Sequence, residues 1–550
     1  MRSARREVLL VALGSVGLAL LMTWPAMRHP GTTVPHDLSD PVVEAWMASW
    51  GGHALLAQPL HLFQANTFWP LPDSYAFNDT LLGLAPLTVF GGGIRGSLIS
   101  YNVLFVLAYA MAFAGAYLLA RQLGAHPVGA LVAGSAYAYA PWRLAHAGHL
   151  NVLSSGAIPL ALAMLARGHG YGRQGYDRNR VRPAWAVAGW AVAAWQVSLG
   201  FALGLAFAYV LLLVCAGALV GWLLARRPRV PGRLIAADLA GGLAFTAVTG
   251  LLSLPYLSVL AAHPEARRGP AELALFSPPL SGYFIAPAAS RLWGSAQAGA
   301  RAHLTWPPEM ALLPGFLLLA LAAAGLVLGA APLRRRLWLA AAVVGSVLLG
   351  LGTTLAGGRY TMLPIQAHLP GWESVRTSGR LALYTTLALG LLAAYAVTRL
   401  AQRLPARAGA ALLLLPVGVL IEGVGTVPHP DVPREPPALH GAPAPVLVLP
   451  SDAYHDNIVM LWSTDGWPLI ANGSTSVQPR AQEEMRRRVA GFPDAASVAY
   501  LRGRGFRTVV LLPGYAFGTP WQGAEAKPVA GLPLTRQLVT GNDWVYRLDR

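Results

Sequence analysis

The sequence predicts an α-helical membrane protein with about eleven transmembrane helices, followed by a small α/β domain outside the membrane. Apolar residues make up 55% of the 550 residues and charged residues only 12%, about half of the ~25% usual in soluble domains. Because a soluble chain of this composition could not cover its own surface, most of it must face lipid. Apolar runs fill residues 1–427, and the composition changes after them, which marks the last domain.

Each predicted span is an apolar run close to the ~20 residues that a helix needs to cross the bilayer. The first run follows arginines and lacks a small-x-small cleavage pattern, which predicts an uncleaved signal anchor with a cytoplasmic N-terminus. Residues 81–93 are apolar but too short to cross, so we expect a re-entrant or interfacial helix there. The runs cover residues 8–27, 98–120, 127–141, 151–166, 184–199, 201–225, 236–257, 310–331, 337–356, 381–400 and 409–427.

Arginines predict the orientation of these spans. The net charge is +17, and the arginines gather in short clusters between the apolar runs. Such an excess is typical of cytoplasmic loops, and no nucleic-acid-binding motif accompanies it, so nucleic acid is excluded as a partner. The loops 28–97 and 258–309 and the C-terminal region then lie outside. The clusters that we expect in the cytoplasm lie at residues 2–6, 121, 167–182, 226–233, 334–336 and 399–407.

The external regions have patterns of their own. Trp46 and Trp50, among the leucines of residues 42–62, predict an amphipathic helix that lies in the membrane interface. A proline-rich linker, residues 428–445, separates the transmembrane domain, residues 1–427, from an extracytoplasmic α/β domain. That domain covers residues 446–550, with strands predicted at 446–449, 458–462, 507–512 and 543–548 and helices at 479–489 and 495–502.

Two acids at the start of the first external loop are candidate catalytic residues. Asp37 and Asp40 stand three residues apart, beside His36 and just beyond the first span. Such a pair could hold a divalent cation or supply a general base. The alternative is ordinary turn chemistry, in which Asp40, before a proline, only starts the next helix.

A second candidate cluster is the segment PWRLAHAGHL at residues 141–150. His146 and His149 would face the same side of a helical turn, but a zinc site would need a third ligand that the sequence does not identify. With Arg143, the histidines could instead bind an anion or a polar headgroup at the outer surface. The alternative is that Arg143 snorkels to the interface beside solvated histidines.

A third candidate cluster precedes the span at 381–400. Arg376 and Arg380 are four residues apart and would stack on one face of a helix near its N-terminus. Their guanidinium groups, with free backbone N–H groups, suit a phosphate or pyrophosphate. The alternative is an ion pair with Glu373 or anchoring in the interface. Glu309, at the outer end of another span, could join this polar site or only stabilise a helix start.

Together these motifs resemble the GT-C superfamily of membrane glycosyltransferases, which use polyprenyl-phosphate-linked sugars. More closely, they are similar to bacterial membrane proteins of the YfhO-like and mannosyltransferase-like groups. The resemblance covers nearly the whole chain. Its short motifs are SDPVVEAWMASW at 39–50, APWR at 140–143 with His149 and Leu150, RTSGRL at 376–381, VLVLP at 446–450 and LRGRGFRTVVLL at 501–512.

The resemblance implies a sugar transfer on the external face of a bacterial plasma membrane. Asp37 or Asp40 would act as the base or orient the acceptor, and could bind a divalent cation such as Mg²⁺ or Mn²⁺. Arg376, Arg380 or Arg143 would bind the lipid-phosphate leaving group. The partners would be membrane lipids, the polyprenyl-phosphate sugar donor and a glycan, lipid or protein acceptor. Many such enzymes carry adjacent acids, whereas two residues separate these, so which acid is catalytic stays open.

Two further functions fit the same sequence. A transporter of lipids or lipid-linked glycans would need polar residues along a path through the membrane midplane. A non-catalytic protein of envelope assembly would use the C-terminal domain as a binding module and would leave the acids and arginines scattered. An enzyme would bring them together on the outer face.

Overall fold

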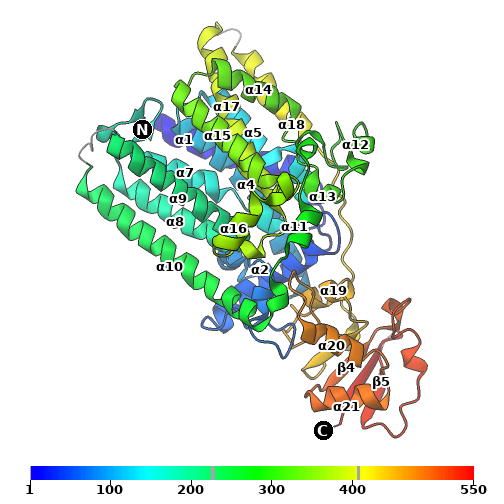
Figure 1. Cartoon of the computed structure of the whole chain (residues 1–550). Helices are drawn as coiled ribbons and strands as arrows, with labels where there is room; N and C mark the ends of the chain where they lie inside the picture. Colours follow the sequence, from blue (N-terminus) through cyan, green and yellow to red (C-terminus); the bar gives the residue numbers. More distant parts are fainter. Residues whose placement is uncertain (1, 225–229, 406–408, 540, 550) are drawn as a thin grey trace. The chain divides into compact units, whose positions relative to one another are not determined.

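The computed structural model describes residues 2–224, 230–405, 409–539 and 541–549 (Figure 1). A helix lies at each of the apolar runs that the sequence identifies. Of the arginines expected in the cytoplasm, those at 226, 227, 229 and 407 lie outside the described residues. The helices at the runs are α1 (Arg2–Met22), α4 (Gly93–Gln122), α5 (Pro127–Tyr139), α6 (Leu150–Leu153), α7 (Ala157–Gly168), α8 (Pro183–Leu199), α9 (Phe201–Leu224), α10 (Gly232–Ala262), α14 (Phe316–Leu328), α15 (Leu333–Gly350), α17 (Ala382–Arg403) and α18 (Leu414–Glu422).

Five helical segments of the described chain are long and apolar enough to cross a membrane. The chain is therefore an integral membrane protein, and the predicted fold class, a helical polytopic protein with a small α/β region at its C-terminus, is confirmed. Other runs form shorter apolar helices, such as Phe316–Leu328 and Ala410–Glu422. The five segments are Gly93–Gln122, Leu150–Gly168, Phe201–Leu224, Gly232–Ala262 and Ser378–Arg403.

The chain forms two compact units. Unit 1 consists of Met1–Trp24, Leu104–Leu252 and Arg267–Pro428. Unit 2 consists of Pro25–Val103, Ser253–Ala266 and His429–Arg550. The first long loop and the C-terminal region, which are far apart in the sequence, thus build one unit.

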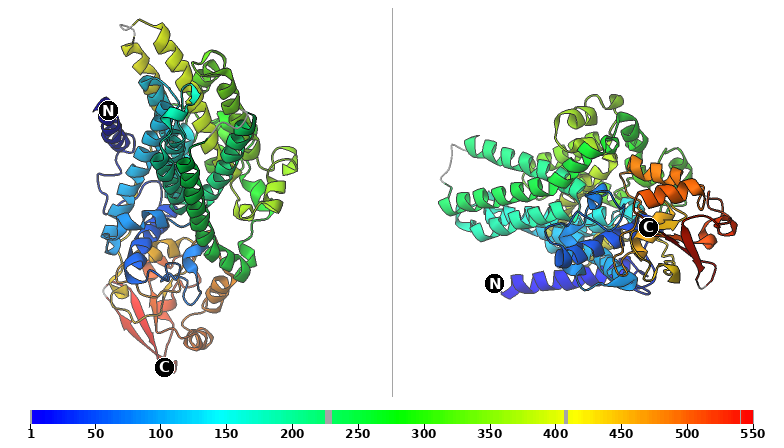
Figure 2. Two further views of the ribbon diagram at one scale, coloured as in Figure 1. Left: turned by 90° about the vertical axis from the view of Figure 1, so that its left-hand side faces the viewer. Right: turned by 90° about the horizontal axis from the view of Figure 1, so that it is seen from below.

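Unit 1 is organised around α17, which packs against α5, α14 and α15 (Figures 1 and 2). Helix α8 packs against both α7 and α9. Small residues allow the close approach of these backbones. A Cβ on Gly129 of α5 would lie 2.5 Å from the Ala394 carbonyl oxygen of α17, and a Cβ on Gly325 of α14 would overlap the Leu392 carbonyl. Membrane helices associate through such small residues because burial of apolar surface does not drive their contact in lipid.

The sheet of unit 2 has four strands, β3 (Val446–Leu449), β4 (Thr508–Leu511), β5 (Leu534–Leu538) and β6 (Trp544–Leu548), in the order β3-β4-β6-β5. β3 and β4 are parallel, with Val446 opposite Thr508, and the other pairs are antiparallel. Every residue of β3 and β4 is buried, as their continuous apolar runs require. Three helices accompany the sheet, α19 (His455–Trp462), α20 (Arg480–Arg488) and α21 (Ala495–Gly503).

Two predictions for this region need correction. Residues 458–462 are not a strand but the end of α19. Asp452 accepts hydrogen bonds from the backbone N–H groups of Tyr454 and His455, both at 2.9 Å, and this local bonding starts a helix. The sequence also gave no sign of β5, because an edge strand with exposed polar residues lacks an apolar pattern.

The predicted interfacial helix at residues 42–62 is also wrong. The segment forms α2 (Asp40–Ala57), which is buried along most of its length against α3 (Ala85–Thr88) and α19. Trp46 donates to the Asn66 side-chain oxygen at 3.2 Å, and Trp50 donates to the Leu62 carbonyl at 3.0 Å. Because nearly every face of α2 is buried, the helix packs within protein rather than lying on a surface.

Segment 81–93 forms a 3-10 turn and the four-residue helix α3, so it makes no spanning helix, as predicted. The remaining short elements are connections between the helices described above. They are α11 (Pro270–Phe276), α12 (Ala298–Ala302), α13 (Pro307–Met310), α16 (Met362–His368) and the hairpin of β1 (Tyr171–Gly172) and β2 (Gly175–Tyr176).

A buried carboxylate ties β3, α19 and α20 together. Asp456, fully buried, accepts hydrogen bonds from Ser451 Oγ at 3.0 Å, Asn472 Nδ2 at 2.7 Å and Arg486 Nη2 at 2.8 Å. Asn472 also bonds both backbone groups of Val448 in β3. The charge is therefore paired and fully hydrogen-bonded, which is the condition for burying it.

We expect Asp456→Ala to destabilise unit 2 by about 3–5 kcal/mol, because it leaves the Arg486 charge uncompensated. Hydrogen–deuterium exchange of β3 and β4 in the purified full-length protein measures the effect. Glu484→Gln, on the same helix α20, is the control: Glu484 pairs with Arg487 and Arg488 in solvent. Equal protection of β3 in the two variants would contradict a structural role for Asp456.

Candidate functional site

The two predicted acids lie in unit 2, at the turn that leads into α2. Asp37 accepts a hydrogen bond from the Ser39 backbone N–H at 2.8 Å and forms a second one, also 2.8 Å, with His36 Nδ1. Ser39 is the N-cap of α2, and Asp40 is its first residue, followed by Pro41. Asp37 therefore makes the hydrogen bonds of the turn, and Asp40 is exposed at the helix start, where the alternative interpretation placed it.

His36 adds charge and backbone strain to this turn. Its hydrogen bond to Asp37, which outweighs its burial, raises the pKa of the imidazole above its ordinary value. The backbone φ of His36 is +80°, a left-handed conformation that residues other than glycine rarely adopt. Such strain is found at functional sites more often than elsewhere.

A buried ion pair lies at the centre of the second group, in unit 1. Arg380 donates to both oxygens of Glu309, from Nη2 at 2.6 Å and from Nε at 3.2 Å. Glu309 belongs to α13, which begins at two prolines, and Arg380 lies in the 3-10 turn Ser378–Leu381 just before α17. The bidentate geometry fixes the orientation of both side chains.

Two histidines complete this group. His146, in the 3-10 turn Pro141–His146, lies with its Nε2 3.9 Å from Glu309 Oε2. The rings of His146 and His149 are 5.3 Å apart, so the predicted proximity of the histidines is correct. Burial lowers the pKa of His146 to about 3, which keeps its imidazole neutral. Burial acts to raise the pKa of Glu309, but the charge and hydrogen bonds of Arg380 lower it by more, so this carboxylate is ionised.

Arg143 is a buried cation with no carboxylate beside it. Only 1% of the residue is exposed, and its guanidinium donates to Ser155 Oγ at 3.3 Å and the Leu153 carbonyl at 3.1 Å. It also lies over the rings of Tyr109, Tyr137 and Trp142, 5.6 to 5.9 Å from their centroids. Within the part of the chain that the structure describes, Arg143 forms no ion pair and its Nε has no hydrogen-bond partner. Snorkelling to solvent, the alternative reading, is therefore wrong.

Arg376 and Arg380 do not stack on one helical face, contrary to prediction. Residues 375–377 are irregular, and the helix begins only after them. Arg376 instead lies 3.5 Å from Glu272 Oε1 and over the ring of Phe276, and Arg380 pairs with Glu309. The pairing of Arg376 with Glu272 could not be predicted from the sequence, because Glu272 precedes Arg376 by about a hundred residues.

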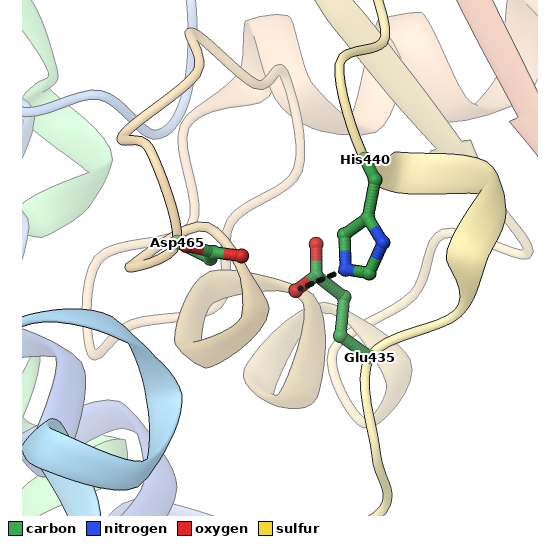
Figure 3. A group of neighbouring side chains, drawn as sticks. All are labelled: Glu435, His440 and Asp465. Carbon is green, nitrogen blue, oxygen red and sulfur yellow. Dashed lines mark ion pairs between the residues drawn. The ribbon is translucent and has the colours of Figure 1, made fainter.

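The described residues hold one group of three side chains that could bind a metal ion, Glu435, His440 and Asp465 in unit 2 (Figure 3). Their ligand atoms all lie within 4.8 Å of one another. The sequence predicted a metal site at Asp37 and Asp40 and did not indicate this group. Asp465 is distant in sequence from Glu435 and His440, which lie in the proline-rich linker. Burial, with Asp465 nearby, raises the pKa of Glu435 to about 7.

No protein-family model and no curated protein matches this chain. Among solved structures it is similar to the Archaeoglobus fulgidus oligosaccharyltransferase tethered with an acceptor peptide, with a TM-score of 0.45, 13% identity and coverage of 92% of this chain and 68% of that chain. It is also similar to AglB from the same organism in complex with an inhibitory peptide and a dolichol-phosphate (0.45, 13%, 99% and 74%). A third is ArnT from Cupriavidus metallidurans in the apo state (0.39, 14%, 99% and 98%).

At 13% to 14% identity and TM-scores below 0.5, these likenesses do not extend to activity.

Acid should destabilise unit 1 through His146. Its pKa is about 3 in the folded protein and 6.5 in the unfolded reference, so below pH ~6.5 the unfolded chain binds the extra proton. Stability is then present above that pH and falls below it, by up to about 1.4 kcal/mol per pH unit. Thermal unfolding in detergent between pH ~5 and ~7.5 measures this slope.

His146→Asn should flatten that pH dependence. The control is His126→Asn, which changes an exposed histidine of the same unit and should keep the wild-type slope. A slope in the His146 variant equal to that of the wild type would show that another group titrates.

Proposed function

We propose that this protein is a membrane glycosyltransferase that moves a sugar from a polyprenyl-phosphate donor to an acceptor hydroxyl on the outer face of a bacterial plasma membrane. The observation that carries the proposal is Arg143. A buried cation without a carboxylate is costly, and such charges are retained in membrane proteins where function requires them. A phosphate group would supply the missing negative charge.

The surroundings of Arg143 suit a phosphate leaving group in particular. The guanidinium of Arg380 already forms an ion pair with Glu309. Among the described residues, the guanidinium of Arg143 contacts only neutral oxygens and aromatic rings. His146, buried and neutral, leaves the Arg143 charge available to a ligand. Stabilising the charge that develops on a leaving group is usually the largest contribution to catalysis. Arg376 and Arg380 are further candidates for donor binding.

The acceptor is assigned to the acids of unit 2. Asp37 or Asp40 would remove the acceptor proton or orient the hydroxyl as it attacks the anomeric carbon, and the sugar–phosphate bond would then break. His36 would hold Asp37 through their hydrogen bond. The oxygens of the two acids are the ligands that Mg²⁺ or Mn²⁺ prefers. A bound divalent cation would neutralise negative charge on the phosphate.

Changing the acids separately tests this assignment. Transfer of labelled sugar from the polyprenyl-phosphate donor, in membranes containing each variant, should fall ~10²–10⁴-fold for the acid that acts as base. Asp37→Asn and Asp40→Asn are both conservative substitutions, and we expect neither to disturb folding. A loss of activity caused by misfolding would be recognised by a lower thermal midpoint. Full activity in both variants would exclude the acids from the reaction.

Changing Arg143 tests the phosphate site. Arg143→Gln should weaken binding of polyprenyl phosphate by at least ~10-fold, since a hydrogen bond to a charged group contributes about 1.5–3 kcal/mol. Arg143→Lys keeps the charge but loses the planar fork, and we expect an intermediate loss. The control is Arg359→Gln, at an exposed arginine that lies over the ring of Tyr360.

The two measurements together separate an enzyme from a transporter. If polyprenyl phosphate bound normally to the Arg143 variants, the assignment of Arg143 as the phosphate site would be wrong, even if Asp37 or Asp40 proved essential for transfer. If the donor bound but its sugar was never transferred, in the wild type as in the Asp variants, a transporter would be favoured.

A further inference from the structure

Three possible metal ligands converge from two segments of unit 2. Glu435 and His440 flank the 3-10 turn Pro437–Leu439, and Asp465 follows the C-terminal end of α19. His440 Nε2 lies 3.2 Å from Glu435 Oε2. Figure 3 shows the imidazole and the Asp465 carboxylate on opposite sides of the Glu435 carboxylate. The ligand atoms of the three side chains all lie within 4.8 Å of one another.

The backbone holds these side chains in place before any ligand arrives. Trp462 Nε1 donates to the Pro433 carbonyl at 2.9 Å, which attaches the linker to α19. The His440 N–H donates to the Pro437 carbonyl at 3.2 Å, and the Asp465 N–H donates to the Trp462 carbonyl at 3.1 Å. Prolines on both sides of the linker segment restrict its backbone further. Little conformational entropy would be lost when the site binds an ion.

The charges of the group call for a cation. The Glu435 side chain is only 10% exposed, and a second carboxylate, that of Asp465, lies within 4.8 Å of it. Two neighbouring carboxylates repel each other, and burial makes this repulsion costly. One divalent cation would keep both carboxylates in the ionised form that burial of Glu435 otherwise disfavours.

We propose that Glu435, His440 and Asp465 bind one Zn²⁺ ion, which joins the proline-rich linker to the end of α19. One nitrogen and two carboxylate oxygens are ligands that zinc accepts, and a water molecule would complete a tetrahedral site. The mixed nitrogen and oxygen set favours zinc over Mg²⁺, which takes oxygen ligands and keeps several waters. The site is separate from Asp37 and Asp40 and does not depend on the proposed glycosyl transfer.

Metal binding to the purified full-length protein tests the proposal. After chelator treatment, calorimetric titration should give one Zn²⁺ per chain that Mg²⁺ at millimolar concentration does not displace. His440→Ala, Glu435→Gln and Asp465→Asn should each weaken binding by at least ~100-fold, since even residues that only orient ligands contribute 10- to 100-fold. Zn²⁺ should raise the thermal midpoint of the wild type but not of these variants.

A second histidine–aspartate pair in unit 2 provides the matched control. His455 Nδ1 lies 2.7 Å from Asp452 Oδ2, but no third ligand joins them among the described residues. His455→Ala should bind Zn²⁺ like the wild type. Equal loss in the His455 and His440 variants, or undiminished binding in all three ligand variants, would overturn the proposal. If a protein bound zinc normally but did not transfer a sugar, that result would contradict the proposed function and leave the zinc site unaffected.

Discussion

The ion pair between Glu309 and Arg380 fixes the start of α17, and α17 is the helix around which unit 1 is built. Arg380 lies one turn before α17, and Glu309 reaches it from a short helix that begins at two prolines. Helices α5, α14 and α15 all pack against α17. Glu309 is buried and Arg380 is only partly exposed, so losing Arg380 would leave a buried carboxylate uncompensated.

The same constraint distinguishes structural charges from functional ones. Glu422 is buried, but it accepts hydrogen bonds from the backbone N–H groups of Phe316 and Leu317 at 2.9 and 3.0 Å, where α14 begins. A carboxylate at a helix N-terminus is stabilised by the helix dipole, which explains the burial of Glu422 without a functional role. Asp456 is equally well paired. Arg143 differs from these buried carboxylates, because the described residues around it are neutral.

Features governed by length and composition were predictable from the sequence. The position of each spanning helix follows from the length of an apolar run, and β3 and β4 follow from runs that are apolar throughout. The predictions failed where contacts between distant residues decide the outcome. Trp46 is buried because Asn66 and α19 cover it, and Arg376 pairs with a glutamate that sequence spacing could not indicate. The same holds for Asp465, which meets Glu435 only through the attachment of the linker to α19.

The composition of unit 2 has a consequence for how this protein is made. Asn66, in the first loop, donates hydrogen bonds to Ser463 Oγ and the Pro468 carbonyl, both at 3.0 Å. At a synthesis rate of about 5–20 residues per second, these partners leave the ribosome tens of seconds after the loop does. During that interval the indoles of Trp46 and Trp50 lack their final environment. The first loop, residues 28–97, can therefore complete its packing only late in synthesis, and a chain cut short before β3 would lack the partners of Asn66.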